Sequence, residues 1–488
     1  MKKVLSFLII LVLLLALYGC ESTNKTKITY QVNFVANAGG YISGANNQIV
    51  QKGGTSEVVK AIPDEGYEFT SWSDGVKDAK RVIDNIEENI NVVANFKKIV
   101  YEYPSIYIIT ENFTKVTSKE EYVKCVVTVD DNKNPEYDMF RVTARIRGRG
   151  NSTWDKPKKP YKLKFDQKVD LFGNGASKTW TLIANYVDPS LMRNYLAYTI
   201  GAQMDDLHFT TTTQFANVYM NGDYQGLYLI CEQIETGKNR VEINDKLDGD
   251  VSFLVELDQR ILDEGKTEGL DYFYVNGQPY GIKAPDTEDE GFTRDYCTKI
   301  KNYLDNALNT VHNKTFSEVE AILDVNSFAD GYIIHELFSS IDVNFSSWYM
   351  YKDKNGKLTN GPIWDFDISA GNCDYNDQAR FNDRLFANVN TWYKYLLRHQ
   401  EFVQIVRDKL VKYHDMILFT IDYEVTEAMK YRSFFEDNFQ KWKILGKYEW
   451  PNPPEIVNIK TWEGQVNYAK NWLFKKLNYM KKYYLQNN

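Results

Sequence analysis

The segment from residue 333 to residue 367 constrains the fold of this chain most, because two short apolar elements in it each end in carboxylates. Apolar residues recur at helical spacing from Ile333 to Ile341, which predicts a helix, and Asp342 follows where this pattern stops. The next apolar residues, Trp348 to Tyr351, have the composition of a strand. The segment is therefore expected to begin with an apolar helix that ends in an acid and to continue into a strand.

The second apolar element closes the same segment. The Asn-Gly pair at 355–356 is its strongest turn signal, and 361–364 is predicted to be a second strand that delivers Asp365 and Asp367. This strand–turn–strand would bring Asp342 and Asp365 to the same end of a hairpin. Carboxylates gathered beside apolar residues suit a hard divalent cation such as Mg²⁺, which leaves positions open for phosphate. Each acid could equally be a turn former or a member of an ion-pair network, and spacing leaves both alternatives open.

The first twenty residues have the pattern of a secretory signal. A basic start is followed by a nearly unbroken apolar run over 4–18, which is too short to span a membrane comfortably. The run closes with Leu17-Tyr-Gly-Cys20, which resembles a bacterial lipobox. We predict a lipoprotein signal peptide over 1–20, a lipid on Cys20 that anchors the chain to the extracellular face of a bacterial membrane, and a polar tether over 21–27.

Composition narrows the class of protein. A chain of 488 residues exceeds one typical core, and 43% hydrophobic with 15% aromatic residues indicates a well-packed globular protein of two or more domains. A net charge of −8 and a pI near 5.4 argue against a nucleic-acid partner. The cysteines include no Cys-x-x-Cys pair and the 5 histidines are scattered, so a zinc or redox site is not expected.

Residues 28–98 are predicted to form a small all-β domain. Alternating apolar residues in several runs are separated by Gly-Gly turns. One strand reads Gly-Tyr-x-Phe-x-x-Trp and the closing strand reads Val-x-Ala-x-Phe. This arrangement resembles the internalin-type B repeat of bacterial surface proteins. The resemblance implies a spacer or adhesive module without catalytic residues.

A larger domain is predicted over 101–488, and its first half is rich in strands. A glycine-rich basic loop, 147–154, contains Arg147 and Arg149, and a lysine-rich segment follows it. Glycine-rich backbone beside Arg and Lys can cradle phosphate, although a solvated basic hairpin would have the same composition. Two further strands each carry an acid, Glu232 at the end of one and Glu256 within the other.

Helical patterns dominate after Asp258. They cover 291–309, 316–323, 325–341, 393–418, 422–441 and 459–485. A β-rich first half and a helical second half predict an α+β fold in two lobes. A β lobe with a glycine-rich loop and lysines, set over a helical lobe with acids, is the division of labour that phosphoryl transfer requires.

Several linked motifs then make a resemblance specific. They are Arg-Gly-Arg-Gly-Asn-Ser-Thr-Trp from residue 147, Trp-Thr-Leu-Ile-Ala-Asn-Tyr-Val-Asp-Pro-Ser-Leu-Met-Arg-Asn from 180, Asn-Gly-Asp-Tyr-Gln-Gly-Leu-Tyr from 221, and Gly-Pro-Ile-Trp-Asp-Phe-Asp from 361. Together they resemble the CotH family of spore-coat-type protein kinases over about 101–484. The resemblance implies an atypical protein-kinase-like fold that uses ATP and Mg²⁺, with Mn²⁺ as a possible substitute, to phosphorylate a Ser/Thr-rich protein.

The resemblance also implies roles for individual residues. Asp342 matches the catalytic aspartate, Asp365 the metal-binding aspartate, and Asp367 the acid that supports metal or nucleotide. Some members carry Asn shortly after the catalytic aspartate, and here Asn344 would have to supply that metal ligand. The remaining candidates are expected to bind the nucleotide: Lys159 and Lys164 with Arg147 or Arg149 at phosphate, and Glu232 and Glu256 as partners of a lysine or of the nucleotide.

Two alternatives to the kinase remain at this point. A lipoprotein works outside the cytoplasmic membrane, where ATP is scarce, so the chain could be an adhesive or binding protein on a kinase-like scaffold. It could also be a metal-dependent glycosyl or nucleotidyl transferase that uses Asp365 and Asp367. Fold alone does not choose among these functions.

Overall fold

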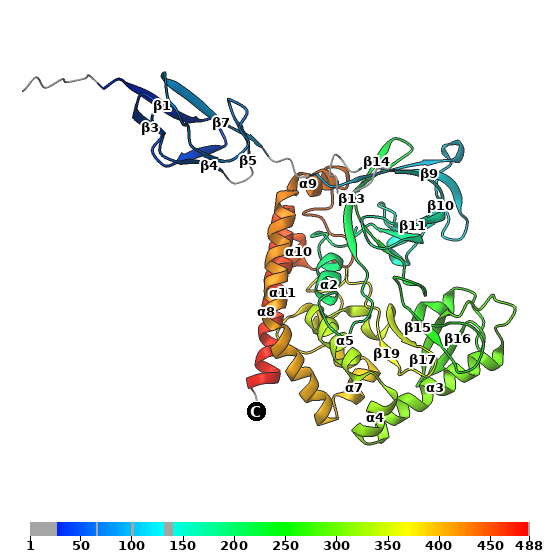
Figure 1. Ribbon diagram of the computed structural model, residues 1–488. Helices are drawn as coiled ribbons and strands as arrows, with labels where there is room; N and C mark the ends of the chain where they lie inside the picture. Colours follow the sequence, from blue (N-terminus) through cyan, green and yellow to red (C-terminus); the bar gives the residue numbers. More distant parts are fainter. Residues whose placement is uncertain (1–26, 65–66, 99–101, 131–139, 487–488) are drawn as a thin grey trace, which may run out of the picture. The chain divides into compact units, whose positions relative to one another are not determined.

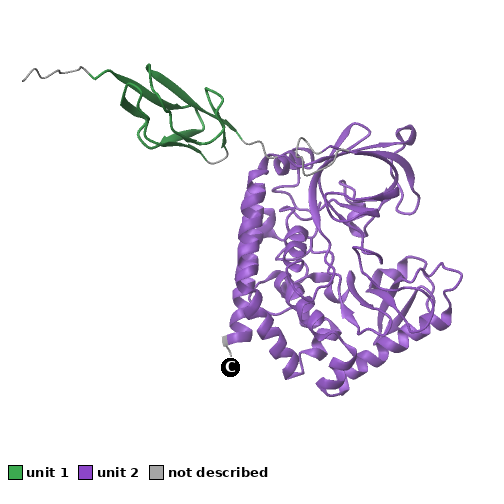
Figure 2. Ribbon diagram, viewed as in Figure 1, with its two compact units in different colours: residues 1–101 green, residues 102–488 purple. Residues whose placement is uncertain are grey.

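The structure is a computed structural model that describes residues 27–64, 67–98, 102–130 and 140–486. The chain divides into two compact units, Met1–Tyr101 and Glu102–Asn488 (Figure 2). The predicted signal peptide, Cys20 and nearly all of the tether lie outside the described residues. Within the described ranges, no helix is both long enough and apolar enough to cross a membrane.

The first unit contains only strands among its described residues, as the sequence predicts. Its larger sheet has the order β3-β1-β7-β5, with β1 and β7 parallel, and its smaller sheet the order β2-β4-β6. Trp72 is fully buried in the core of the unit, where its ring meets Phe34 edge-on at 5.7 Å. The strands are β1 (Thr29–Ala36), β2 (Gly40–Ser43), β3 (Asn47–Gln51), β4 (Val59–Pro63), β5 (Tyr67–Trp72), β6 (Lys80–Arg81) and β7 (Ile90–Lys98).

The second unit begins with a closed β-barrel of order β10-β11-β12-β14-β13-β8-β9 (Figure 1). Ile146 and Leu163 are fully buried in its interior, so the alternate residues of β10 and β11 face outward. Cross-strand pairing sets Arg147 opposite Lys162 and Arg145 opposite Lys164 on that outer face. The strands are β8 (Ser105–Thr110), β9 (Val123–Asp130), β10 (Phe140–Gly148), β11 (Tyr161–Val169), β12 (Ser177–Ile183), β13 (Thr213–Met220) and β14 (Asp223–Glu232).

A second sheet of this unit has the order β16-β17-β15-β18-β19. It combines β15 (Phe253–Leu257), β16 (Tyr272–Val275), β17 (Gln278–Ala284), β18 (Trp348–Lys352) and β19 (Thr359–Asn360). The β16–β17 hairpin is absent from the sequence-based prediction, which assigns no strand or helix between Asp258 and residue 291. Its turn is Asn276-Gly277, both with positive φ, and this pair is a strong hairpin signal.

The predicted strand over 361–364 is wrong. On the side away from β15, β18 pairs only with the short β19, and the chain then runs on irregularly toward Asp365. Pro362 has no amide hydrogen to donate to a ladder, and Gly361 has a φ of +114°. The hairpin therefore ends early, and an irregular segment presents the two acids.

Most of the helices lie below the barrel in Figure 1, α9 lies beside it, and α8 and α11 run side by side along one flank. They are α2 (Arg193–Gly201), α3 (Arg294–Asn313), α4 (Phe316–Ile322), α5 (Val325–Phe338), α6 (Asp377–Arg380), α7 (Thr391–Leu396), α8 (Gln400–Lys430), α9 (Arg432–Lys441), α10 (Pro454–Val457) and α11 (Trp462–Lys481). The predicted break between 418 and 422 is wrong, because no Gly or Pro interrupts α8 there. The protein thus has an α+β fold with an N-terminal all-β unit.

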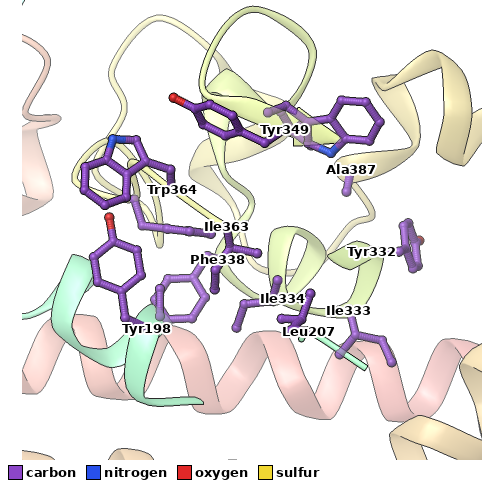
Figure 3. Packing of buried hydrophobic residues seen from close by; sticks show 14 of the residues in the cluster. Tyr198, Leu207, Tyr332, Ile333, Ile334, Phe338, Tyr349, Ile363, Trp364 and Ala387 are labelled. Carbon is purple, nitrogen blue, oxygen red and sulfur yellow. The ribbon is translucent and has the colours of Figure 1, made fainter. Parts of the chain in front are cut away.

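Helix α5 lies at the centre of the largest core. All but one of its residues are buried, so the helix is buried on every side rather than along one stripe. Figure 3 shows Ile334 and Phe338 of α5 near Tyr198 of α2 and Trp364. The rings of Tyr198 and Trp364 stack with centroids 5.6 Å apart. This packing gives the residues on either side of Asp342 and Asp365 a rigid support.

Candidate active site

Several parts of the second unit line one cavity of about 240 Å³, and three of them carry its charged residues. The first is the glycine-rich segment after β10. The second is the chain around β15 and β17, and the third is the pair of segments that carry the predicted acids. The polar residues that line the cavity are Arg149, Asn151, Ser152, Thr153, Asn185, Gln233, Glu256, Asp258, Arg260, Glu264, Lys283, Asp342, Ser347, Tyr349, Asp365 and Asp367.

Asp342 reaches the cavity because α5 stops sharply. Ser339 caps that helix in the left-handed conformation, and a short 3₁₀ turn, η4 (Ile341–Asn344), then carries Asp342. Burial of its carboxyl group, followed by the negative charge of Asp365, raises the pKa of Asp342 to about 7. The positive charge of Arg260 opposes that rise. The two acids are therefore close enough to interact, as the sequence predicts.

Asp365 is held in an uncommon backbone conformation. Its φ is +66°, in the left-handed region that non-glycine residues seldom adopt, and such residues cluster at functional sites. Its amide donates to the Tyr198 hydroxyl at 3.2 Å, and the next amide, of Phe366, donates to Asn194 Oδ1 at 2.7 Å. Ser347 Oγ donates to the Asp365 carboxylate at 3.3 Å. Helix α2 thus fixes the backbone that presents this acid.

Asp367 completes a group of three carboxyls. It is 5% exposed, and burial, then the charges of Asp365 and Asp342, raise its pKa. Among the described residues, no group of three or more His, Cys, Asp or Glu side chains has the arrangement to hold a metal ion. Mg²⁺ commonly takes one or two carboxylates and completes its shell with phosphate and water. The position of Asp365 and Asp367 in one cavity fits that mode of binding.

A buried ion pair supports the loop after Asp367. Arg193 Nη1 lies 2.5 Å from Asp188 Oδ1, and both side chains are fully buried. Arg193 also donates to the carbonyls of Ser369 at 2.9 Å and Ala370 at 3.3 Å. The sequence Asp188-Pro-Ser190 is typical of a helix start, but α2 begins at Arg193. Asp188 instead accepts from the amides of Ser190 and Arg193, at 2.9 Å each.

Replacing Arg193 with Met should lower the free energy of unfolding by about 3–5 kcal/mol, because it leaves the buried Asp188 carboxylate without its cation. Urea denaturation of the full chain measures this change. Arg432→Met is the matched control, since Arg432 pairs with Glu436 and Glu463 at the surface and should cost less than about 1 kcal/mol. Equal losses in the two variants would contradict a special role for the buried pair.

The cations of the cavity come from three different segments. Lys283 on β17 lies 2.8 Å from Glu256 on β15, and Glu256 also accepts from the Ser347 amide at 3.1 Å. Burial lowers the pKa of Lys283, but the charges of Glu256 and Asp258 outweigh this effect and raise it overall. The Lys283 side chain is therefore a charged ammonium group surrounded by carboxylates.

Two arginines flank this ion pair. Arg260 donates to Ser346 Oγ at 3.0 Å, and the guanidinium of Arg149 lies 5.5 Å from the centre of the Trp364 ring. Asp258 caps the 3₁₀ turn that carries Arg260, and burial, then the charge of Glu256, raise the pKa of Asp258 to about 6. The cavity thus combines an excess of carboxyls with cations placed to meet an anion.

The structure brings together some of the sequence-predicted site residues and places others elsewhere. Asp342, Asp365, Asp367, Arg149 and Glu256 line the cavity. Five further candidates are outside its lining as far as the described residues define it: Lys159, Lys164, Arg147, Glu232 and Asn344.

The residues outside the lining have other partners or positions. Lys159 Nζ donates to the Trp154 carbonyl at 2.6 Å, and Arg147 donates to the Lys119 carbonyl. Lys164 is exposed on the outer face of the barrel. Glu232 accepts from Thr211 Oγ1 at 2.6 Å and from Thr212 Oγ1 at 2.6 Å, beside a separate cavity. Asn344 ends the turn that carries Asp342.

Sequence analysis missed Lys283 and Arg260 as candidates. Both lie between Asp258 and the first helix predicted after it, at 291–309, where the sequence-based prediction contains no element. The Asn276-Gly277 pair predicts a hairpin there, and it could have placed Lys283 on a strand beside Glu256. Arg260 carries no comparable local signal, because its role depends on which distant residues surround it.

The fold and the site define an α+β protein whose acidic cavity lies beside a glycine-rich basic segment. The family model described as CotH kinase protein matches residues 146–480, and the chain belongs to this family. A model of a divergent InlB B-repeat domain matches residues 30–100. A search of curated proteins finds no significant match. Membership of the CotH family suggests a spore-coat kinase-like protein.

Proposed function

We propose that this chain is an atypical protein kinase that transfers the γ-phosphoryl group of ATP to Ser or Thr of a surface or coat protein. The convergence of Asp342 and Asp365 in one cavity with the Lys283–Glu256 ion pair is the observation that carries the proposal. Protein kinases require a catalytic-loop aspartate, a metal-binding aspartate and a lysine paired with a glutamate. The β-barrel with its glycine-rich segment and the helical part would form the two lobes of a kinase-like architecture.

Each residue has a role that its position supports. Asp365 and Asp367 would hold Mg²⁺ or Mn²⁺, which supplies neutralising charge at the transferring phosphates when bound. Lys283, Arg260 and Arg149 would contact phosphate oxygens, and Glu256 would keep the Lys283 ammonium in place. Asp342 would accept the proton of the acceptor hydroxyl while the phosphorus–oxygen bond to ADP breaks and a new bond to the serine oxygen forms.

The predicted location sets where the acceptor would be found. A lipid on Cys20 would anchor the chain at the extracellular face, and the B-repeat domain would hold the catalytic unit away from the membrane. The same B-repeat match favours a second candidate function, in which the chain binds a surface partner without phosphorylating it.

Labelled ATP tests the proposal directly. The chain from residue 21 onward, with Mg²⁺ or Mn²⁺ and dephosphorylated casein as acceptor, should incorporate phosphate on serine. Thermal-shift measurements with ATP, with sugar nucleotides and with no ligand separate the candidates, because a ligand stabilises the state that binds it. Stabilisation by ATP with Mg²⁺ supports the kinase, stabilisation by sugar nucleotides a transferase, and the absence of any shift a binding protein.

Replacing Lys283 with Met should reduce phosphate transfer by about 100-fold, because one preorganised cation at the phosphates is lost. Glu256→Gln should have a smaller effect of the same sign, since Lys283 keeps its charge. The rate of casein phosphorylation and the KM for ATP measure both effects. Lys299→Met is the control, because Lys299 makes only a surface pair with Asp295. Unchanged kinetics in the Lys283 variant would remove this residue from the nucleotide site.

A further inference from the structure

A second cavity, of about 370 Å³, lies at the end of β14. Its lining comes from the loop between β11 and β12, the segment before β13, the last residue of β14, residues 239–242 and one residue of β18. No described residue lines both this cavity and the candidate active site. We refer to it as the β14 cavity.

The lining of the β14 cavity contains a buried cation, Arg240, which is only 3% exposed. Its guanidinium lies 5.0 Å from the centre of the Trp180 ring, and its Nη1 donates to the Asn239 carbonyl at 2.7 Å. Its Nε and Nη2 are buried and have no hydrogen-bond partner among the described residues. These two nitrogens form the edge of a guanidinium that can bind a carboxylate or a phosphate through two parallel hydrogen bonds.

Neither carboxylate in the lining supplies the missing partner. Glu232 is 3.9 Å from Arg240 Nη1, and its oxygens already accept from the hydroxyl and the amide of Thr212, at 2.6 Å and 2.8 Å. Glu242 accepts from the Asn239 amide at 3.0 Å. Both acids therefore have donors of their own, and the free edge of Arg240 faces the cost of a buried charge without a hydrogen-bonded partner.

Two neutral groups in the same lining also lack partners among the described residues. They are Asn174 Nδ2 and Thr210 Oγ1, and both atoms are buried. The remaining titratable side chain, His208, pairs with Asp324 at 2.8 Å. Buried polar groups in native proteins are almost always hydrogen-bonded, so three such groups around one cavity indicate that it has an occupant.

The chemistry of these groups defines the occupant. A guanidinium edge, an amide NH₂ and a hydroxyl can all donate, so the occupant must offer several acceptor oxygens. Water can satisfy the two neutral groups, but it does not neutralise the charge of Arg240. A negatively charged group with two or more oxygens does both. The volume of the β14 cavity is close to the lower end of small-molecule pockets, which commonly start at about 300 Å³.

We propose that the β14 cavity binds a small molecule through a phosphoryl or carboxylate group. The oxygens of that group accept from Arg240 Nε and Nη2, from Asn174 and from Thr210. The inference does not depend on the proposed kinase function, because the described residues that line the β14 cavity take no part in the candidate active site.

Isothermal titration of the full chain with inorganic phosphate, and separately with acetate, tests the proposal. Both titrations are made at constant ionic strength in chloride and without divalent cations. Wild type should bind at least one of the two ions saturably, and the ion that binds distinguishes a phosphoryl from a carboxylate ligand. Arg240→Met should raise the Kd by about tenfold or more. Arg240→Lys should restore binding only in part, because an ammonium keeps the charge but not the two parallel donors.

Two further variants show where the ion binds. Lys283→Met removes a cation of the candidate active site, and Arg432→Met removes a surface arginine with partners of its own. Both should bind the ion as wild type does. Thr210→Val keeps the shape of the side chain and removes its hydroxyl, so the Kd should rise by about threefold or more. This variant carries the test if thermal denaturation shows that Arg240→Met does not fold.

Three outcomes would overturn the proposal. If neither ion binds wild type saturably, water alone occupies the β14 cavity. If Arg240→Met, or Thr210→Val in its place, binds as tightly as wild type, the ion binds elsewhere. If Lys283→Met abolishes binding, the ion belongs to the candidate active site. None of these measurements uses phosphate transfer, so failure of the kinase proposal would leave the result readable.

Discussion

Asp365→Asn should lower phosphate transfer to casein by about 10³-fold, because Asn cannot supply the negative charge that holds a divalent cation against the phosphates. The fold should survive, since Asn tolerates the left-handed backbone at this position and leaves its amide free to donate to Tyr198. The measurement is the initial rate of phosphate incorporation over a range of Mg²⁺ concentrations.

The thermal shift caused by ATP gives a second readout for the same variant. In wild type the shift should depend on Mg²⁺, and in Asp365→Asn this dependence should be lost. Asp295→Asn is the control, because Asp295 is a surface residue paired with Lys299. If Asp365→Asn and Asp295→Asn transferred phosphate equally well, the assignment of Asp365 to the metal would have to be abandoned.

Asp342→Asn should reduce transfer by about 10²–10⁴-fold, because the acceptor hydroxyl loses the group that takes its proton. ATP binding should be nearly unchanged, which separates this variant from Asp365→Asn. Rate measurements at saturating ATP and casein test the first expectation, and the thermal shift with ATP and Mg²⁺ tests the second. Retained transfer would exclude Asp342 as the base.

The same substitution should change how stability depends on pH. The pKa of Asp342 is about 7 in the folded state, above the ordinary value of 3.8, and the pKa of Asp367 is raised as well. At pH values between the ordinary and the raised pKa of these carboxyl groups, the folded protein therefore binds more protons than the unfolded chain. Its free energy of unfolding falls as the pH rises through that window.

In the presence of a chelator, the free energy of unfolding of the wild type should fall by on the order of 1–3 kcal/mol between pH 5 and pH 8. That of Asp342→Asn should fall by less. Adding Mg²⁺ should restore part of the loss in wild type, because a cation offsets the charge on the carboxylates. Urea denaturation at several pH values, with and without Mg²⁺, measures these changes. Identical pH curves for the two proteins would show that Asp342 does not titrate in this range.

Local patterns predicted much of what these experiments address. Alternating apolar residues predicted an all-β N-terminal unit, and helical spacing predicted α3, α4, α5 and α11 to within a few residues. The apolar helix before Asp342 and the turn before Asp365 were enough to predict that these acids lie close together. Such inferences succeed because backbone conformation and the burial of one face depend mainly on neighbours in the sequence.

The cations of the site could not be predicted from local patterns. Lys162 and Lys164 alternate along their strand and share one face, but Ile146 and Leu163 fill the barrel, so that face points outward. The cavity instead receives Lys283 and Arg260 from the sheet that β15 organises. Closure of the barrel and pairing of β15 with β17 settle which lysine reaches Glu256, and no short stretch of sequence contains that information.

The helices, the strands and the position of the acids thus depend on short stretches of sequence. The ion pairs form between residues that are far apart in the sequence. Propensity, turn residues and periodicity act over a few residues, so helices, strands and the Asp342–Asp365 encounter could be predicted from them. A charge is tolerated inside a protein where a partner from elsewhere in the chain offsets its desolvation, as Glu256 does for Lys283 and Asp188 for Arg193. Such partnerships form only when distant segments pack together, and in this protein they decide which residues make the site.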